Sequence, residues 1–295
     1  MVKNALSLFK SGFYSLSVTI AGVAACHSQA APQNQIADQE PSRRSRDCGN
    51  ATWCEDFESY SLGQEQGVKA KLQGDSALSI ETVPDGQGGS AIKAIAAGRS
   101  TAFLELAPLQ LGLSSQHIYG RFRVLLESAP TESVHWTLLA GSGTRPDGQQ
   151  AIYRYGGQHR IQHPDGSSGS QWMANYETPE FYSNQGEGSD CWHHAAGRTI
   201  DEGRWLCVEW EFDGENDAMH LWLDGQPAED LSVEGVGQGC LHQKENYPWS
   251  APKFETISIG WESYQEDDSR TIWIDDIALS NSERLGCSRL EQQEE

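Results

Sequence analysis

The chain has 295 residues, a formal net charge of −21 at pH 7, 37% hydrophobic residues and seven cysteines. This negative charge argues against nucleic acid as a partner and against a basic membrane-binding face. It also weighs mildly against an anionic glycan, unless positive charge is concentrated locally. An acidic surface by itself usually indicates only solubility.

The first 25 residues have the features of a secretory signal. Lys3 and Lys10 precede an apolar run over about residues 16–25, which is too short to span a membrane. Small residues then lead to Cys26, and this run resembles a bacterial lipobox. We therefore expect an exported protein, either lipidated at Cys26 and anchored to the cell envelope, or secreted. The alternative is an ordinary signal peptide with an incidental cysteine.

Three further segments complete the expected domain organisation. Residues 26–46 are rich in Gln, Ala, Ser and Pro, so they cannot build a core and are expected to form a flexible tether. Residues 47–290 suffice for one large β-domain, and residues 291–295 form an acidic tail. We expect the domain to be a monomer.

Short alternating segments dominate this domain, and helical periodicity is nearly absent. Clusters of Gly, Asp, Asn and Ser separate the segments, a pattern typical of an all-β sandwich or jelly roll. The expected strands are residues 91–95, 102–106, 118–126, 134–139, 151–155, 160–163, 205–212, 218–223, 256–261 and 271–279. Asp224-Gly225 predicts a hairpin turn, because this dipeptide adopts the positive φ angles that such a turn needs.

Two longer segments, residues 165–198 and 234–252, are expected to be irregular loops. They carry Trp172, Trp192 and Trp249. Long aromatic loops over a β-scaffold commonly form the walls of a binding site. We therefore expect these three side chains to bind substrate by stacking on sugar rings.

The cysteines predict a disulfide-bonded domain. Once Cys26 is set aside, six cysteines remain, an even number that suits an oxidising compartment and predicts three disulfides. Although six cysteines allow many connectivities, the short loop makes Cys48–Cys54 the easiest pair. We favour Cys207–Cys287 next, which leaves Cys191–Cys240. The competing zinc site has no support, because no Cys-x-x-Cys pair is present.

Two carboxylates interrupt the apolar alternation of the last predicted strand, at Asp275 and Asp276. The apparent partner of this strand is the early segment 54–59, which carries Glu58. Because unpaired carboxylates do not sit in a core without a counter-charge, we predict a structural Ca²⁺ between the two segments. Its expected ligands are Glu58, Asp275, Ser90 and a backbone carbonyl near Gln87. The alternative is that Asp275 and Asp276 simply cap a solvent-facing edge.

The best candidate for an active-site strand is the segment 150–160. If it stays extended, Arg154, Gln158 and Arg160 point to one side, and Gly156-Gly157 leaves room for a ligand to approach the backbone. Arginine binds a carboxylate with two parallel hydrogen bonds, and glutamine adds a neutral one. The three side chains therefore suit the carboxylate of a uronic acid. The alternative is an exposed salt bridge on a very acidic surface.

His135 and Tyr264 are the candidates for proton transfer. His135 alternates with two apolar neighbours in its strand, and the ordinary pKa of a histidine side chain lies near neutrality. Tyr264 follows a predicted core strand, and a tyrosine near an arginine can transfer protons. Structural hydrogen bonding and packing are the respective alternatives.

Several short motifs resemble one known family in their order along the chain. They are Asp56-Phe57-Glu58-Ser59, Arg154-x-Gly156-Gly157-Gln158, Gly260-Trp261-Glu262-x-Tyr264 and Trp273-x-Asp275-Asp276-Ile277. Together they resemble the core domain of the family of cellulose-induced protein one, over about residues 54–287. The resemblance implies a concanavalin-like β-jelly roll with a bound calcium, similar to glucuronan and alginate lyases.

The same resemblance assigns roles to single residues. It implies calcium ligation by Glu58, Ser90 and Asp275, although the family's fungal member has asparagine at the position of Ser90. The family's active-site residues correspond to Arg154, Gln158, Tyr264 and His135, and a family disulfide corresponds to Cys207–Cys287. A further family histidine is replaced by Ile152.

These observations predict an exported protein that acts on an extracellular polysaccharide. The preferred hypothesis is a polysaccharide lyase that cleaves a uronic-acid-containing glycan by β-elimination. The first alternative is a non-catalytic glycan-binding lipoprotein. A glycoside hydrolase ranks third, because it needs two carboxylates across a cleft and the chain offers only Glu209-Trp210-Glu211 as a partial match to a known hydrolase motif.

Overall fold

The computed structural model describes residues 48–58, 66–84, 89–130, 132–178, 188–241 and 246–287. All of them belong to the unit Pro41–Glu295. The predicted signal, the predicted tether, the predicted lipidation site Cys26, the predicted calcium ligand Gln87 and the acidic tail lie outside the described residues.

The described residues form an all-β fold, as predicted. The strands are β1 (Trp53–Glu55), β2 (Val68–Thr82), β3 (Ser90–Leu106), β4 (His117–Leu126), β5 (Trp136–Thr144), β6 (Gln150–Gln162), β7 (Ser168–Glu177), β8 (Asp190–Thr199), β9 (Trp205–Asp213), β10 (Ala218–Leu223), β11 (Gln226–Pro227), β12 (Val233–Glu234), β13 (Gly239–Cys240), β14 (Lys253–Ser263) and β15 (Arg270–Ser280). Two 3₁₀ turns, η1 (Pro108–Leu111) and η3 (Glu229–Leu231), are the helical elements described. None of the helices in this part of the chain has the length and apolar character that a membrane-crossing helix needs.

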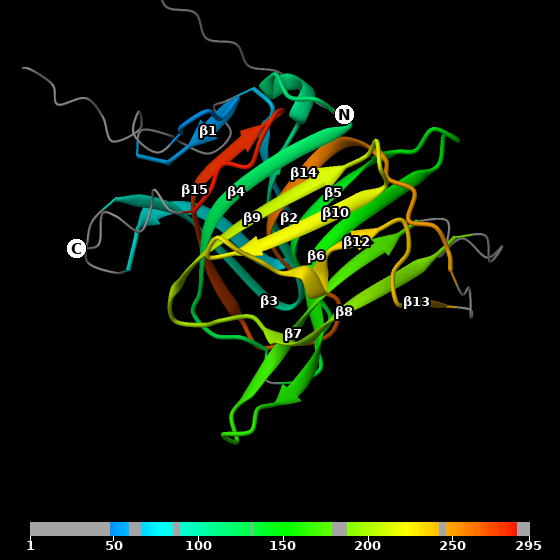
Figure 1. Ribbon diagram of the computed structural model, residues 1–295. Coiled ribbons are helices and arrows are strands. Elements are labelled where there is room, and N and C mark those ends of the chain that lie inside the picture. The colour runs from blue at the N-terminus through cyan, green and yellow to red at the C-terminus, as the bar shows by residue number, and fades with distance from the viewer. Residues whose placement is uncertain are drawn as a thin grey trace, which may run out of the picture. The chain divides into compact units, whose positions relative to one another are not determined.

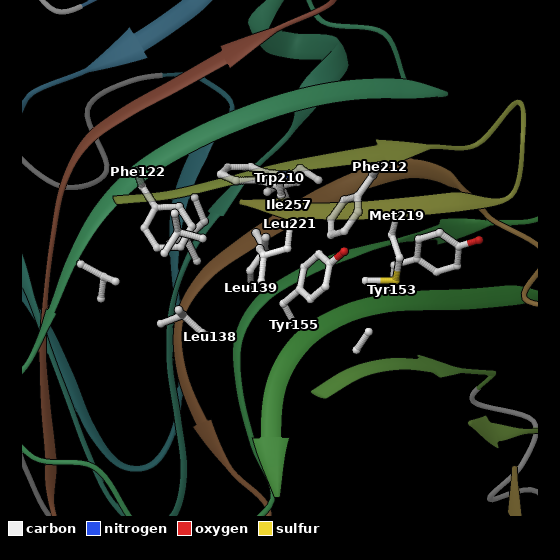
Figure 2. Packing of buried hydrophobic residues seen from close by; sticks show 14 of the residues in the cluster. Phe122, Leu138, Leu139, Tyr153, Tyr155, Trp210, Phe212, Met219, Leu221 and Ile257 are labelled. Atoms are coloured by element: carbon white, nitrogen blue, oxygen red, sulfur yellow. The ribbon is translucent and has the colours of Figure 1, made fainter. Parts of the chain in front are cut away.

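The strands form one continuous antiparallel ladder in the order β11-β10-β9-β4-β15-β3-β14-β5-β6-β7-β8-β13, with β1, β12 and β2 paired at its sides. The ladder folds back on itself, so that side chains of β4, β9 and β10 meet those of β5, β6 and β14 (Figure 2). Tyr155 of β6, for example, stacks on Phe212 of β9 with ring centroids 6.1 Å apart. The core therefore lies between two layers of strands.

The first and last strands pair directly, as the sequence predicts. Cys54 of β1 lies opposite Ala278 of β15 in an antiparallel register, and Figure 1 shows β1 (blue) beside β15 (red). Asp224 and Gly225 have φ angles of 48° and 73°, which confirms the predicted hairpin turn between β10 and β11. The three predicted disulfides, Cys48–Cys54, Cys191–Cys240 and Cys207–Cys287, are all formed.

Several strand predictions were wrong. Residues 165–198 were expected to be an irregular loop, but they contain β7 and β8. The inner half of β7 is buried on both faces, so its sequence shows no alternation. β2 was missed because it is mostly exposed and polar. The predicted strands 91–95 and 102–106 are two parts of the single 17-residue strand β3.

Candidate active site and metal centre

Arg154 is a buried cation on β6. Its neighbours Tyr153 and Tyr155 point into the core, so strand alternation places Arg154 on the opposite face of the sheet. The Nη1 group donates hydrogen bonds to Asn175 Oδ1 at 3.2 Å and to Glu177 Oε2 at 2.6 Å, both on β7. The other guanidinium nitrogens make no hydrogen bond to the described residues and remain available as donors.

Tyr264 follows β14 and brings its ring to Arg154. The Arg154 Cζ atom lies 5.8 Å from the centroid of the Tyr264 ring. The hydroxyl donates to Glu262 Oε2 at 2.7 Å and lies 3.3 Å from Thr137 Oγ1. Burial raises the pKa of Tyr264 well above its ordinary value, and the nearby Glu262 carboxylate acts in the same direction. The hydroxyl is therefore protonated at neutral pH.

His135 packs against Tyr264, with ring centroids 4.6 Å apart. The two segments are also joined by a hydrogen bond from Tyr264 N to His135 O of 2.9 Å. Burial lowers the pKa of His135 to about 4, and the charges of Arg154, His194 and His159 act in the same direction. His135 is therefore a neutral imidazole at neutral pH, beside a protonated phenol and a guanidinium.

Gln158 and Arg160 are separated from this group by an irregularity in β6. The register between β6 and β7 shifts between Gly157 and Arg160, which interrupts the two-residue period behind the predicted common direction. Gln158 is half-buried and Arg160 is exposed, where Nη2 donates to Ser168 Oγ at 3.1 Å. The described residues thus bring together Arg154, Tyr264 and His135.

The glycines in this segment serve the sheet itself, contrary to the prediction that they leave room for a ligand. A Cβ atom on Gly156 would lie 1.9 Å from the Trp136 carbonyl oxygen on β5. A Cβ atom on Gly157 would lie 2.2 Å from the carbonyl oxygen of Gln171 on β7. Both positions therefore need glycine so that the neighbouring strands can approach.

Two of the predicted sugar-stacking tryptophans are core residues, so that prediction was wrong for them. Trp172 is 0% exposed and packs against Trp136, while Trp249 is 1% exposed and stacks on Tyr176. The side chains of Trp172 and Trp249 point into the core because of the strand and loop on which they lie. The residue type alone does not predict this direction. Trp192 on β8 is half-buried and remains a candidate to contact a ligand.

The predicted metal ligands gather where β1 and β15 meet. Glu58 Oε1 accepts a hydrogen bond of 3.2 Å from Ser90 N. Burial raises the pKa of Asp275 to about 9, and the charges of Asp276 and Glu58 add to this effect. Asp56 Oδ2 is also buried and has no hydrogen-bond partner among the described residues. Arg123 is the cation beside this group, 3.9 Å from Asp276, and the several carboxylate oxygens there fit a hard cation such as Ca²⁺.

A second group of potential ligands lies on β4 and β9. His117, Glu211 and Asp213 place their ligand atoms within 4.8 Å of one another, and no other group of this kind occurs among the described residues. Hydrogen bonds already engage them: His117 Nε2 lies 2.7 Å from Glu211 Oε1, and Asp213 Oδ2 accepts from Asn216 at 2.7 Å. We assign no metal there. Only the strand register, which places His117 opposite Asp213, could have identified this group.

Glu209, half of the partial hydrolase motif, is also engaged. It is 1% exposed and forms an ion pair of 2.8 Å with Arg284, while Gly286 N donates to it at 2.8 Å. This carboxylate holds the segment after β15 on the sheet. It offers no support for the hydrolase hypothesis.

Comparisons with known proteins agree with this architecture. A family model described as Polysacc_lyase-like, Cip1-like, core domain matches residues 76–282. The solved structure of the cellulose-induced protein Cip1 matches with a TM-score of 0.55 and 19% identity, over 80% of this chain and 99% of that one. An endo-beta-1,4-glucuronan lyase from the fungus Trichoderma reesei matches with a TM-score of 0.52 and 12% identity, over 79% and 96% of the two chains. These likenesses confirm the jelly-roll fold. No curated protein matches the sequence.

Proposed function

The chain belongs to the Cip1-like core-domain family of polysaccharide-lyase-like proteins, and from this premise we propose that it is a polysaccharide-active protein that cleaves a uronic-acid-containing glycan by β-elimination. One observation carries the proposal. A guanidinium, a protonated phenol and a neutral imidazole lie together at Arg154, Tyr264 and His135. One structurally similar protein is an endo-beta-1,4-glucuronan lyase, which supports a uronic-acid-containing glycan as the substrate class.

In β-elimination a base removes the proton on the carbon next to the carboxyl group. The resulting enolate-like intermediate collapses to a carbon–carbon double bond, and the bond from the β-carbon to the glycosidic oxygen breaks. Arg154 would stabilise the intermediate, because its free N–H groups can donate to the carboxyl oxygen on which charge develops. A donor that is already oriented by Glu177 and Asn175 needs little reorganisation during the reaction.

The two remaining groups suit the proton transfers. His135 is unprotonated at neutral pH and would accept the proton from carbon. Tyr264 is protonated and would donate its proton to the departing glycosidic oxygen. Gln158, half-buried on the same strand as Arg154, would add a hydrogen bond to the substrate.

We also propose that Glu58, Ser90 and Asp275, together with Asp56, hold a structural Ca²⁺. The ion would add positive charge beside the carboxylates of Asp275 and Asp276, which raise each other's cost of ionisation and have Arg123 as a nearby cation. It would also fasten the segment after β1 to β15. The group lies apart from the catalytic residues in the proposal, so its role is stability.

The proposed location is outside the cytoplasm. Three disulfides suit an oxidising compartment. Anchoring through a lipid on Cys26 is the finer proposal, and its test is incorporation of labelled fatty acid that a Cys26→Ser variant abolishes.

A non-catalytic glycan-binding protein is the second candidate, because the Arg154 guanidinium is already paired with Glu177 and Trp192 is partly exposed. The deciding experiment measures ultraviolet absorbance of unsaturated uronyl products from glucuronan, alginate, ulvan and pectate, each with Ca²⁺. We expect a rise with at least one glycan, absent in Arg154→Lys and retained in Arg160→Ala. Retention of a glycan without any product would establish the binding protein instead.

A further inference from the structure

The positive charge of Arg154 is already offset by carboxylates before any substrate binds. Arg154 and Glu177 form an ion pair of 2.6 Å, with 9% and 11% of their side chains exposed. Asn175, the second partner of Arg154, also donates to Asp190 Oδ1 at 2.8 Å. The charge of Glu262 also acts on Arg154, and this carboxylate accepts hydrogen bonds from Tyr264 at 2.7 Å and from Thr101 at 3.1 Å. Two carboxylates, Glu177 and Glu262, therefore act on one guanidinium.

Among the residues that the structure describes, no other cation compensates for this negative charge. Arg160 is exposed, lies beyond the register shift in β6, and is 3.9 Å from Glu132. His135 carries no charge at neutral pH. The internal segments 59–65, 85–88, 131, 179–187 and 242–245 contain one lysine, Lys244, one histidine, His242, and no arginine. A polysaccharide with a free carboxylate would bring a further negative charge to Arg154, where negative charges already outnumber positive ones.

Apolar surface lies beside the guanidinium. Ile152 precedes Arg154 by two residues on β6, so strand alternation places it on the same face, and it is half-buried. In the β6–β7 register Ile152 lies opposite Glu177, and Arg154 lies opposite Asn175. A substrate group bound at Arg154 would therefore contact a methyl-bearing side chain at one edge.

We propose that the site accepts a uronyl group whose charge is masked, as in a methyl-esterified polyuronide, in preference to the free acid. This inference rests on the proposed lyase function and specifies its substrate class. The ester carbonyl would accept hydrogen bonds from the free N–H groups of Arg154, and the methyl group would lie against Ile152. Glu177 then becomes a specificity-determining residue. Its carboxylate neutralises the positive charge of Arg154, which would otherwise attract a free carboxylate on the substrate.

The chemistry of an ester fits this arrangement. Removing a proton beside a neutral ester gives a singly charged enolate, whereas removal beside a carboxylate gives a doubly charged one. The step is balanced as before: His135 takes the proton, the double bond forms, the bond to the glycosidic oxygen breaks, and Tyr264 protonates that oxygen. The ester itself is unchanged. A single guanidinium suffices to stabilise one negative charge.

The test compares one polyuronide in its highly methyl-esterified form with the same polymer after saponification. We expect the initial rate of unsaturated product formation to be about tenfold or more higher on the ester, because like charges repel in a buried site. Raising the ionic strength from about 0.01 M to about 0.15 M should leave most of this preference in place, because charges in a buried site are screened much less than exposed ones. This measurement needs no variant.

A Glu177→Gln variant supplies the second arm, since it removes the charge and keeps the shape. It should raise the rate on the free acid and narrow the preference, while a Glu132→Gln variant, at an exposed position, should not. Faster cleavage of the free acid by the wild-type protein would overturn this inference and leave the lyase proposal intact. Absence of product from both forms, across the glycan panel above, would overturn both.

Discussion

Glu177 Oε2 and Arg154 Nη1 lie 2.6 Å apart on adjacent strands, in a pair that is nearly excluded from solvent. Such a pair costs desolvation energy to bury, so its main effect on stability appears when one partner is removed. Arg154→Ala leaves a buried carboxylate and should lower the free energy of unfolding by about 3–5 kcal/mol.

Denaturant unfolding at neutral pH checks this prediction. Arg160→Ala, at an exposed arginine, should change the free energy of unfolding by less than about 0.5 kcal/mol. A double variant Arg154→Met/Glu177→Leu should be more stable than a variant in which Arg154 alone or Glu177 alone is truncated to alanine. Equal effects of Arg154→Ala and Arg160→Ala would contradict the pairing.

Calcium is expected to raise the thermal unfolding temperature relative to the chelated protein. Asp275→Asn should abolish this increment, because it removes a proposed ligand. The same variant should be at least as stable as the wild type in chelator, because burial disfavours the charged form of Asp275. Asp165→Asn, an exposed turn residue, serves as the control and should keep the full calcium response.

The contribution of His135 to the stability of the domain should fall as the pH decreases from about 6.5 to about 4. The pKa of His135 is lowered to about 4 in the folded protein, so the unfolded chain binds a proton in this window that the folded protein does not. The expected contribution is at most about 3 kcal/mol, and above pH 6.5 it is fully present. His193 and His194, whose pKa values burial also lowers, act in the same direction.

Unfolding curves of His135→Gln across this pH range test the assignment. The variant should show a shallower dependence than the wild type and keep the part that His193 and His194 contribute. An unchanged dependence would show that His135 is accessible to protons in the folded protein.

Trp192 and Trp172 should separate binding from folding. Trp192→Ala should weaken glycan binding and raise KM, with little effect on stability, because the side chain is only half-buried. Trp172→Ala should cost about 3–5 kcal/mol, since its ring is fully enclosed by the core. Calorimetric glycan titration and denaturant unfolding of both variants give the comparison. A Trp192→Ala protein with unaltered glycan affinity would remove this residue from the binding site.

The sequence predicted the parts of the fold in which one strand face is polar and the other apolar. The pairing of the early acidic segment with the last strand was predictable, because the carboxylates of Glu58 and Asp275 stand out from apolar surroundings. β7 was not predictable from alternation, because both of its faces are covered over most of its length. Alternation of apolar and polar residues reveals a strand only when one of its faces is buried and the other is exposed.

For the candidate site, the identity of the residues was easier to predict than their partners. Arg154, Tyr264 and His135 were named from motifs and come together in space. Glu177 was missed, although it forms an ion pair with Arg154. The two residues meet only through the register of β6 and β7, which the sequence does not reveal. The direction of Trp172 was also hidden, since a tryptophan suits a sugar-binding surface and a core equally well.

The pairing of β1 with β15 has a consequence for engineering. Asn50 Nδ2 donates to Glu283 Oε1 at 2.8 Å, and Thr52 N donates to Leu279 O at 2.8 Å, so the chain enters and leaves the sandwich at one place. A short linker between these two points would close the polypeptide into a ring, and new ends could then be opened in an exposed turn such as Asp165-Gly166. Because the two ends of the domain lie close together, it could also be inserted into a surface loop of another protein without distorting that protein's fold.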